Sequence, residues 1–344
     1  MLDMTRIWYR QSFSLLVIFL LPFSFLFGIC VKVRRFFYRQ GVLKSYHLTN
    51  TPRIPVIVVG NITVGGTGKT PFVIWLVHFL KAQGYSPGIV SRGVGAKPHR
   101  TPYFVRTEDS AQVVGDEAIL LQSTGCPLVV CVNRVAAVRE LLSRAECDVI
   151  ISDDGLQHYR LQREIEIVLV DGERYFGNRY LLPAGPLREP VSRLNSVDFV
   201  VVNGSEKQDN FSSSVAGGGF SGDRHAMTFI PTEFISLKKG TVIPLAEFPF
   251  KKVHAVCGIG NPNRFFNSLR NSGFEIIPHV FKDHYHYKQQ DFDFTDDLPI
   301  LMTEKDAVKC YSFAEERFWY LRITVKINRE LEEKLIKKLK SIGV

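Results

Sequence analysis

The chain has 344 residues, of which 45% are apolar and 22% charged, an ordinary globular balance for a protein long enough to form two domains. Its six cysteines are scattered, without a CxxC pair or zinc-like spacing, which argues against a disulfide framework and favours reduced thiols in the cytosol. The formal net charge is +9, and residues 4–107 contain neither Asp nor Glu, so this part of the chain suits an anionic partner, either nucleic acid or a membrane surface.

An uncharged apolar stretch at residues 13–31 decides between these partners. As a helix it would be about 28 Å long, close to the hydrocarbon thickness of a bilayer, with a kink expected at Pro22. A signal peptide or a buried core helix are the alternatives, but the run is long, no Ala-x-Ala-like site follows, and the flank at residues 32–40 mixes cations with aromatic side chains. We therefore predict a retained membrane-associated segment over residues 1–40, with the chain after residue 32 on the cytoplasmic side. Whether the segment spans the bilayer or lies half-sunk in it stays open.

The stretch IPVIVVGNITVGGTGKTPFVIWLVHFL, residues 54–80, predicts a buried strand at 56–59, a glycine-rich loop and a helix with apolar spacing over 72–80. This is the setting of a phosphate-binding loop, although Thr63 stands where the usual pattern has glycine. A glycine-rich hairpin is the alternative, which the order of the flanking elements disfavours. The loop is predicted to bind a nucleoside triphosphate, with Lys69 on the β- and γ-phosphates and the Thr70 hydroxyl on Mg²⁺. Its residues are Thr63, Val64, Gly65, Gly66, Thr67, Gly68, Lys69 and Thr70.

Two acidic pairs follow the loop. Asp116 and Glu117 precede an apolar helical run, where a simple charge bias at a helix N-terminus is an equally good interpretation of the residues alone. Asp153 and Asp154 come directly after a hydrophobic strand at 149–151. Ligands gather at the carboxyl ends of parallel strands, so these carboxylates are candidates for Mg²⁺, and a surface turn is the alternative.

Strands and helices alternate along the chain, which predicts a doubly wound, mostly parallel α/β sheet of the P-loop NTPase kind. A Ser/Gly-rich stretch at 204–225 separates a second, smaller α/β unit with strands at 253–257, 274–280, 300–302 and 318–327 and a Lys-rich C-terminal helix. The predicted domains are 1–40, 41–225 and 226–344. Three histidines, His279, His284 and His286, could suggest a metal site, but no further ligand cluster completes one.

Three classes of function fit a membrane-tethered nucleotide loop: a kinase acting on a membrane-borne acceptor, a switch ATPase of the partitioning or targeting kind, and a nucleotide-gated binding module. A kinase needs a base for the acceptor hydroxyl, and Asp116 with His284, which follows Asp283, can supply one. The second unit is hard to explain in a bare switch protein.

At this point a resemblance covers nearly the whole chain. NITVGGTGKTP, VGDEA, DDGLQH, LLPAGPLREP, GIGNPNRFF, KDH and MTEKD, in this order behind an apolar leader, resemble the tetraacyldisaccharide 4′-kinase (lipid A 4′-kinase) family. The resemblance implies ATP- and Mg²⁺-dependent phosphorylation of the 4′-hydroxyl of tetraacyldisaccharide 1-phosphate, giving lipid IVA in lipopolysaccharide synthesis. It also implies a cytoplasmic-face enzyme of the bacterial inner membrane whose active site lies in the cleft between two α/β domains. We expect a monomer with no nucleic-acid partner.

The resemblance also assigns roles to residues. It implies Asp116 as general base with His284 as its partner, and Glu117 and Asp154, beside Asp153, as Mg²⁺ carboxylates. The remaining positions that it implies for phosphate or sugar contacts are Arg134, His158, Arg188 and Glu189. Ala118 stands where the family often has proline, and the nearby His286 leaves open which histidine partners Asp116.

Overall fold

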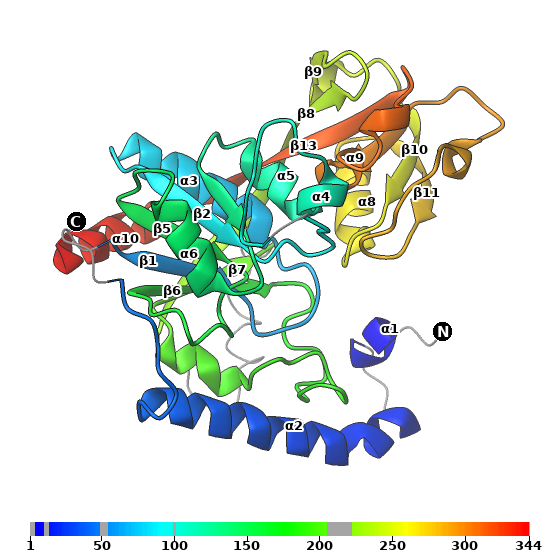
Figure 1. Ribbon diagram of the computed structural model, residues 1–344. Coiled ribbons are helices and arrows are strands. Elements are labelled where there is room, and N and C mark those ends of the chain that lie inside the picture. The colour runs from blue at the N-terminus through cyan, green and yellow to red at the C-terminus, as the bar shows by residue number, and fades with distance from the viewer. Residues whose placement is uncertain (1–3, 10–13, 49–53, 99–100, 205–221, 344) are drawn as a thin grey trace.

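The computed structural model describes residues 4–9, 14–48, 54–98, 101–204 and 222–343. Over these residues one continuous sheet runs through the molecule, in the strand order β11-β10-β12-β13-β8-β7-β6-β1-β5-β2-β4-β3, with β9 paired to β8 (Figure 1). The strands are β1 (Val56–Gly60), β2 (Pro87–Ser91), β3 (Tyr103–Phe104), β4 (Leu128–Val130), β5 (Val149–Asp153), β6 (Ile165–Asp171), β7 (Phe199–Asn203), β8 (Asp223–Ser236), β9 (Val242–Pro244), β10 (Lys252–Cys257), β11 (Glu275–Val280), β12 (Ile300–Thr303) and β13 (Phe318–Ile327). The α-helices are α1 (Met4–Trp8), α2 (Leu15–Arg39), α3 (Lys69–Ala82), α4 (Ala111–Val114), α5 (Asp116–Gln122), α6 (Arg134–Leu142), α8 (Pro262–Asn271), α9 (Glu304–Ala307) and α10 (Arg329–Ile342).

The sheet has two parallel halves joined by an antiparallel seam. The N-terminal half contains β1, β2 and β4 to β7, which run parallel, and the C-terminal half contains β10 to β13, which also run parallel to one another. Between them β8 pairs parallel with β7 over its first residues and antiparallel with β13 over the rest. The two halves therefore point in opposite directions, and the carboxyl ends of both sets of strands face each other. Loops that follow the strands of one half can thus meet loops from the other half.

The prediction of a mostly parallel α/β sheet is confirmed, while the long seam was not foreseen from the sequence. The predicted domain boundary at residue 225 falls inside β8, which belongs to both halves. Most of the stretch on which that boundary was based, residues 205–221, lies outside the described residues. The division into two domains stays a prediction.

Two apolar cores enclose the N-terminal half, as expected for a doubly wound sheet. On one face α3 buries Phe72, Leu76 and Leu80, which recur at helical spacing and are 0% exposed. The C-terminal helix α10 packs into the same core through Leu331, Leu335 and Leu339. The other face is covered by α6 and by the segment before β7. The chain thus ends against the unit in which the phosphate loop lies.

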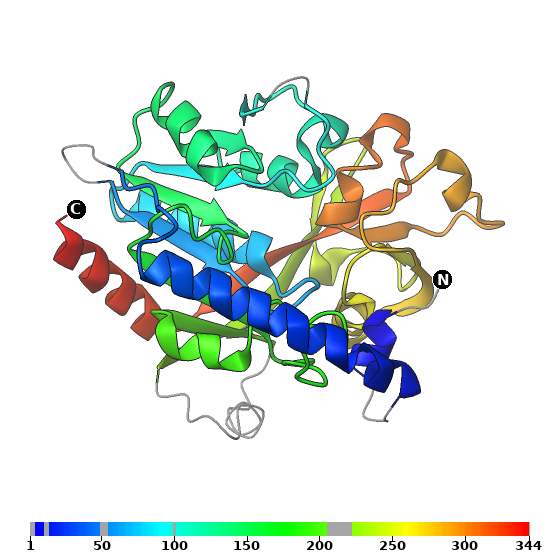
Figure 2. The ribbon, with the colours of Figure 1, turned by 60° about the horizontal axis from the view of Figure 1, so that its bottom comes forward.

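The N-terminal apolar segment forms α2, a helix that continues through Pro22 and lies along the edge of the molecule (Figures 1 and 2). Ten of its large apolar side chains are exposed, among them Phe19 at 70% and Phe25 at 73%. Its inner face is made of small residues: the Ser24 hydroxyl donates to the Leu181 carbonyl at 2.7 Å, and Gly28 packs against the Leu181 side chain. Among the described residues, α2 is the one helix that is both long enough and apolar enough to cross a membrane, judged by length and composition.

Candidate active site

The phosphate-binding loop connects β1 to α3, and its conformation is set by glycines and by hydrogen bonds to neighbouring segments. Gly65 and Gly68 adopt φ of 107° and 91°, values that favour glycine. A Cβ at Gly68 would lie 2.6 Å from the Asn203 amide nitrogen, which instead donates to the Thr67 carbonyl at 3.0 Å. Thr63 and Val64 pair with the following loop, where the Val64 amide donates to the Pro186 carbonyl at 2.8 Å. Glycine is required where β7 approaches, and the unusual Thr63 lies where the loop is tied down by backbone pairing.

Lys69, the first residue of α3, faces the acidic end of β5. Its Nζ lies 3.5 Å from Asp154 Oδ1, and Arg188 Nη1 lies 3.2 Å from both oxygens of the same carboxylate. Burial would raise the pKa of Asp154, but the charges of Lys69 and Arg188 outweigh it and lower the pKa to about 2. Asp154 is therefore a carboxylate anion held between two cations at the carboxyl edge of the sheet.

Asp153 is buried one residue earlier and is only partly satisfied. Its Oδ2 accepts a hydrogen bond from the Ser91 hydroxyl at 3.1 Å, while its buried Oδ1 has no partner among the described residues. Burial raises the pKa of Asp153, and the nearby charges of Glu117 and Asp154 raise it further. Glu117 thus lies close enough to act on Asp153, and Lys69 acts on the same carboxyl in the opposite sense. The phosphate loop and α5 consequently face one site.

An oxygen-rich site of this kind fits Mg²⁺. The described residues contain no group of three or more His, Cys, Asp or Glu side chains that could hold a metal ion by itself. Mg²⁺ does not need one, since it commonly takes one or two carboxylates together with water and substrate phosphates. The orphaned Asp153 oxygen, the Glu117 carboxylate and Thr70 in the first turn of α3 supply hard oxygen donors beside the phosphate loop.

Asp116 begins α5 and meets a histidine from the other half of the sheet. His284 Nδ1 lies 3.3 Å from Asp116 Oδ2, whereas His286 is exposed. The structure thus selects His284 as the histidine that contacts Asp116. Burial alone would raise the pKa of Asp116, but the hydrogen bond from His284 and the charge of Lys309 outweigh it and hold the pKa below its ordinary value.

Two lysines after β12 complete this cluster, and sequence reasoning did not single them out. Lys305 Nζ lies 3.2 Å from Glu117 Oε1 and 3.3 Å from His284 Nε2. Lys309 Nζ lies 3.5 Å from Asp116 Oδ2 and 3.1 Å from Asp306 Oδ1. Lys305 belongs to the MTEKD motif and Lys309 lies three residues after it, but nothing in the spacing of this stretch shows that it faces α5 across the molecule. Together the two lysines tie α9 and its following turn to α5 (Figure 1).

The other predicted positions are placed around this edge in different ways. Arg134 is buried and donates to the carbonyls of Cys131 and Asp153 at 2.8 and 3.0 Å, so it fixes strand ends. His158 Nε2 accepts the Arg134 amide proton at 3.2 Å, and burial together with nearby arginines lowers the pKa of His158 to about 4. His158 is therefore a neutral ring at physiological pH.

Glu189 follows Arg188 but points into the protein and is 1% exposed. Its carboxylate accepts hydrogen bonds from Gln157 at 2.8 Å, from the Tyr159 hydroxyl at 2.5 Å and from Arg193 at 3.1 Å. This differs from the expected ligand contact, because the carboxylate is already enclosed by protein donors.

The three histidines noted in the sequence do not gather at one place, in keeping with the expectation that they form no metal site. His279 lies at the outer edge of the C-terminal half, where its Nε2 is 2.9 Å from His254 Nδ1, while His284 is turned toward Asp116. His254 Nε2 in turn contacts Asp296 Oδ1 at 2.8 Å.

The GIGNP turn after β10 brings the C-terminal half of the sheet against the phosphate loop. A Cβ at Gly260 would lie 2.9 Å from the backbone nitrogen of Gly66 in the phosphate loop. Arg174 Nη1 donates to the Gly260 carbonyl at 2.5 Å, and Arg264 Nη2 lies 2.7 Å from Asp171 Oδ1. The two arginine contacts tie the turn and α8 to the end of β6 and the loop after it, while Gly260 itself lies against the phosphate loop.

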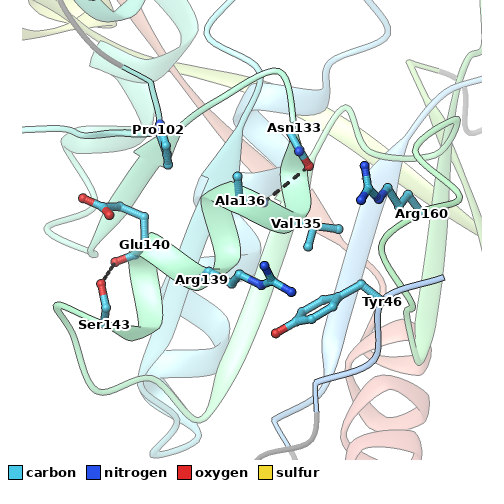
Figure 3. A pocket seen from close by; sticks show the side chains of 9 residues that line it. All are labelled: Tyr46, Pro102, Asn133, Val135, Ala136, Arg139, Glu140, Ser143 and Arg160. Atoms are coloured by element: carbon cyan, nitrogen blue, oxygen red, sulfur yellow. Dashed lines mark hydrogen bonds between the residues drawn. The ribbon is translucent and has the colours of Figure 1, made fainter. Parts of the chain in front are cut away.

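A separate pocket of about 450 Å³ lies on the outer side of α6 (Figure 3). It is lined by residues of α6, by Tyr46 after α2 and by Arg160, and the Arg139 guanidinium lies 4.4 Å from the centre of the Tyr46 ring. None of the predicted loop or carboxylate positions belongs to its lining. The chemistry described above is therefore at the sheet edge and not in this pocket.

Comparisons with known proteins agree on one family. The sequence model of the family described as tetraacyldisaccharide-1-P 4′-kinase matches residues 16–340. The tetraacyldisaccharide 4′-kinase of Methylobacillus flagellatus is 49% identical over 97% of this chain and 95% of its own length, and that of Nitrosococcus oceani is 48% identical over 94% and 90%. A crystal structure of LpxK from Aquifex aeolicus in complex with ATP superimposes with a TM-score of 0.78 at 30% identity, covering 96% of this chain and 100% of that one.

Proposed function

This chain belongs to the tetraacyldisaccharide-1-phosphate 4′-kinase family, and we propose how its residues carry out the reaction of that family. The enzyme transfers a phosphoryl group from ATP to the 4′-hydroxyl of tetraacyldisaccharide 1-phosphate in lipid A biosynthesis. The single observation that supports the residue roles below is that the carboxyl end of β5 lies between the two groups: Lys69 Nζ is 3.5 Å from Asp154 Oδ1, and Glu117, next to the Asp116–His284 pair, acts electrostatically on Asp153.

The phosphoryl donor is bound by the loop of residues 63–70. Its backbone N–H groups and the N-terminus of α3 surround the phosphates, and Lys69 neutralises charge on the β- and γ-phosphates. In the structure, the Lys69 ammonium and the Asp154 carboxylate only neutralise each other. We therefore expect the ammonium to leave Asp154 for the phosphates when ATP binds. Thr70, Glu117, Asp153 and Asp154 would be the oxygen donors for Mg²⁺, which would offset the charge of the transferring phosphoryl group.

Asp116 accepts the proton of the 4′-hydroxyl while the hydroxyl oxygen attacks the γ-phosphorus. The O–H bond breaks toward the carboxylate, a new O–P bond forms, and the bond to the β-phosphate oxygen breaks so that ADP leaves with the electron pair. His284 donates a hydrogen bond to Asp116 Oδ2 and orients the carboxylate. A low pKa keeps Asp116 ionised and ready to accept this proton.

The four remaining positions predicted from the sequence serve the same reaction, two by contacting the substrates and two by supporting the site. Arg188 is 28% exposed at its side chain and can contact phosphate, and His158 offers a neutral ring to the sugar. Arg134 and Glu189 are buried, so we assign them to holding the sheet edge and the 183–190 loop in place.

The exposed apolar face of α2 brings the enzyme to its lipid substrate. The helix contacts the body of the protein along its length, from Ser24 with Leu181 to Arg35 with Ser196 at 2.6 Å. A helix held flat against the protein in this way fits a half-sunk position better than a span, with its basic end at anionic headgroups. We place the enzyme as a monomer on the cytoplasmic face of a bacterial inner membrane, because one chain supplies both sides of the site.

The test is transfer of label from [γ-³²P]ATP. Membranes containing the enzyme are incubated with labelled ATP, Mg²⁺ and the disaccharide 1-phosphate. We expect label on the lipid, removed when Mg²⁺ is chelated. A switch ATPase, the alternative from the sequence, would release only free phosphate, and that result would refute the proposed roles.

A further inference from the structure

Lys305 occupies a position that the roles above do not explain. It belongs to α9, and its ammonium group contacts three side chains from two other segments: Glu117 Oε1 of α5 at 3.2 Å, and Asp283 Oδ1 at 3.5 Å and His284 Nε2 at 3.3 Å in the loop after β11. Its side chain is 20% exposed, so solvent screens these contacts only in part. Besides pairing with two carboxylates, Lys305 therefore contacts a ring nitrogen of the histidine that meets Asp116.

The donors and acceptors around His284 determine where its ring proton lies. Two groups face Nε2: the Lys305 ammonium at 3.3 Å and, farther away, Asp283 Oδ1 at 4.0 Å, which the same ammonium pairs with at 3.5 Å. An ammonium group has three donors and no acceptor, so Nε2 presents a lone pair to Lys305, its nearer partner. An ionised carboxylate only accepts, so the other nitrogen, Nδ1, must carry the proton that is donated to Asp116 Oδ2. Both ring nitrogens have polar partners at 3.3 Å, which also fixes the orientation of the ring.

The backbone supports the same arrangement. His284 adopts φ of 58°, which is uncommon for a residue with a side chain, and its amide donates to Asp283 Oδ1 at 3.1 Å. Asp283 therefore holds both the turn that carries His284 and the ammonium that contacts its ring. The segments of His284 and Lys305 are joined before either one meets α5.

We propose that Lys305 is a positioning residue that keeps Nε2 of His284 unprotonated, so that the ring stays neutral and donates from Nδ1 to Asp116. This rests on the role proposed for Asp116 above. The contacts from His284 and Lys309 both reach Oδ2, and Oδ1 of Asp116 accepts no hydrogen bond from the described residues. The acceptor hydroxyl can therefore approach Oδ1, while the lysine prevents the ring from taking a second proton and forming a tight ion pair with the base.

The experiment combines a direct reading of the ring with kinetics. Full-length enzyme in detergent is labelled with ¹⁵N-histidine, and the His284 signals are assigned by their loss in His284→Ala. Ring protonation is read at neutral pH without ATP, lipid or Mg²⁺, and kcat and KM are measured separately. The variants are Lys305→Met, Lys305→Arg and, as control, Lys252→Met, which removes an exposed lysine that pairs with Glu275 at 2.9 Å on the same half of the sheet.

In the wild type and the Lys252→Met control we expect a proton on Nδ1 only. In Lys305→Met, Nε2 should become protonated in a large fraction of molecules, kcat should fall by about tenfold or more, and KM for ATP should change by less than about twofold. Lys305→Arg, which can still donate to Nε2, should keep the Nδ1 proton and more of kcat.

A wild-type ring protonated on Nε2 would overturn the proposal even if Lys305→Met does not fold. The same protonation state of the His284 ring in wild type and Lys305→Met would also overturn the proposal. Since the ring is read without turnover, these results leave the assignment of Asp116 untouched. A wild type that carries the proton on Nδ1 but shows no kinase activity would instead contradict the proposed function and leave the role of Lys305 intact.

Discussion

Alanine at Gly260 should push the GIGNP turn away from the phosphate loop. The added Cβ would lie 2.9 Å from the Gly66 nitrogen, whereas ordinary contacts are 3.4–4 Å, so the two backbones must separate by about 0.5 Å. Neither partner is a flexible side chain, and the Arg174 hydrogen bond to the Gly260 carbonyl opposes the shift. A misplacement of 1 Å in an active site can lower the rate about 100-fold. A shift of half that size therefore corresponds to a loss of roughly tenfold in kcat, or about 1.4 kcal/mol in activation free energy.

The assay is transfer of labelled phosphate to the lipid at saturating ATP, together with KM for ATP. Melting temperature should stay close to that of the wild type, because the clash can be relieved by opening the two halves without disturbing either core. Asn267→Ala, an exposed change on the neighbouring helix α8, is the control and should behave as wild type. Wild-type kcat in Gly260→Ala would refute the close approach of the turn to the loop.

Three further sets of substitutions and one labelling experiment test other parts of the structure. Asp116→Ala should lower kcat by about 100-fold or more with little change in ATP binding, measured by steady-state kinetics and calorimetry, and equal turnover would remove Asp116 from the mechanism. His284→Ala should lower kcat less, because the carboxylate remains, and unchanged activity would count against its orienting role. Phe19→Lys combined with Phe23→Lys should move the enzyme from the membrane to the soluble fraction, while Val17, on the buried face, is not a suitable site for such a change. Burial raises the pKa of Cys310 to about 12 and that of Cys147 to about 11, so alkylation at pH 8 should spare these two thiols in the native enzyme and label them only after unfolding, which mass spectrometry can check.

The parts of the site that were predictable are those encoded in one continuous segment. Strand β1, the glycine loop and α3 follow each other directly, and the side chains of Asp153 and Asp154 end the strand beside β1 in the sheet. Local spacing and the rule that ligands gather at carboxyl ends were sufficient for these. The apolar helix α2 was predictable for the same reason, because it is one uninterrupted apolar run.

Contacts between distant segments were not predictable in this way. The pattern of β8 mixes half-buried and exposed positions because its two ends belong to different halves, so it lacks the alternation that identifies a strand. Lys305 and Lys309 lie in a short helix and the turn after it, and only the opposed direction of the two halves brings them to α5. His284 and His286 are two residues apart in a loop, where spacing does not determine direction.

Glu189 shows a different limit of sequence reasoning. Its neighbour Arg188 reaches Asp154, so an acid beside it suggested a second ligand contact. The side chain instead turns inward to Arg193 four residues later and to Tyr159. Adjacent residues in an extended loop point to opposite sides, and only the fold shows which side faces the ligand.

The most direct test is a single-turnover reaction with the wild type and Asp116→Asn, each preloaded with [γ-³²P]ATP and Mg²⁺ before the disaccharide 1-phosphate is added. If Lys69 and Asp116 act on one phosphoryl group, the wild type should transfer its bound label to the 4′-position. The variant should keep its ATP bound but transfer the label at least about 100-fold more slowly. Transfer at the wild-type rate by Asp116→Asn would contradict this account.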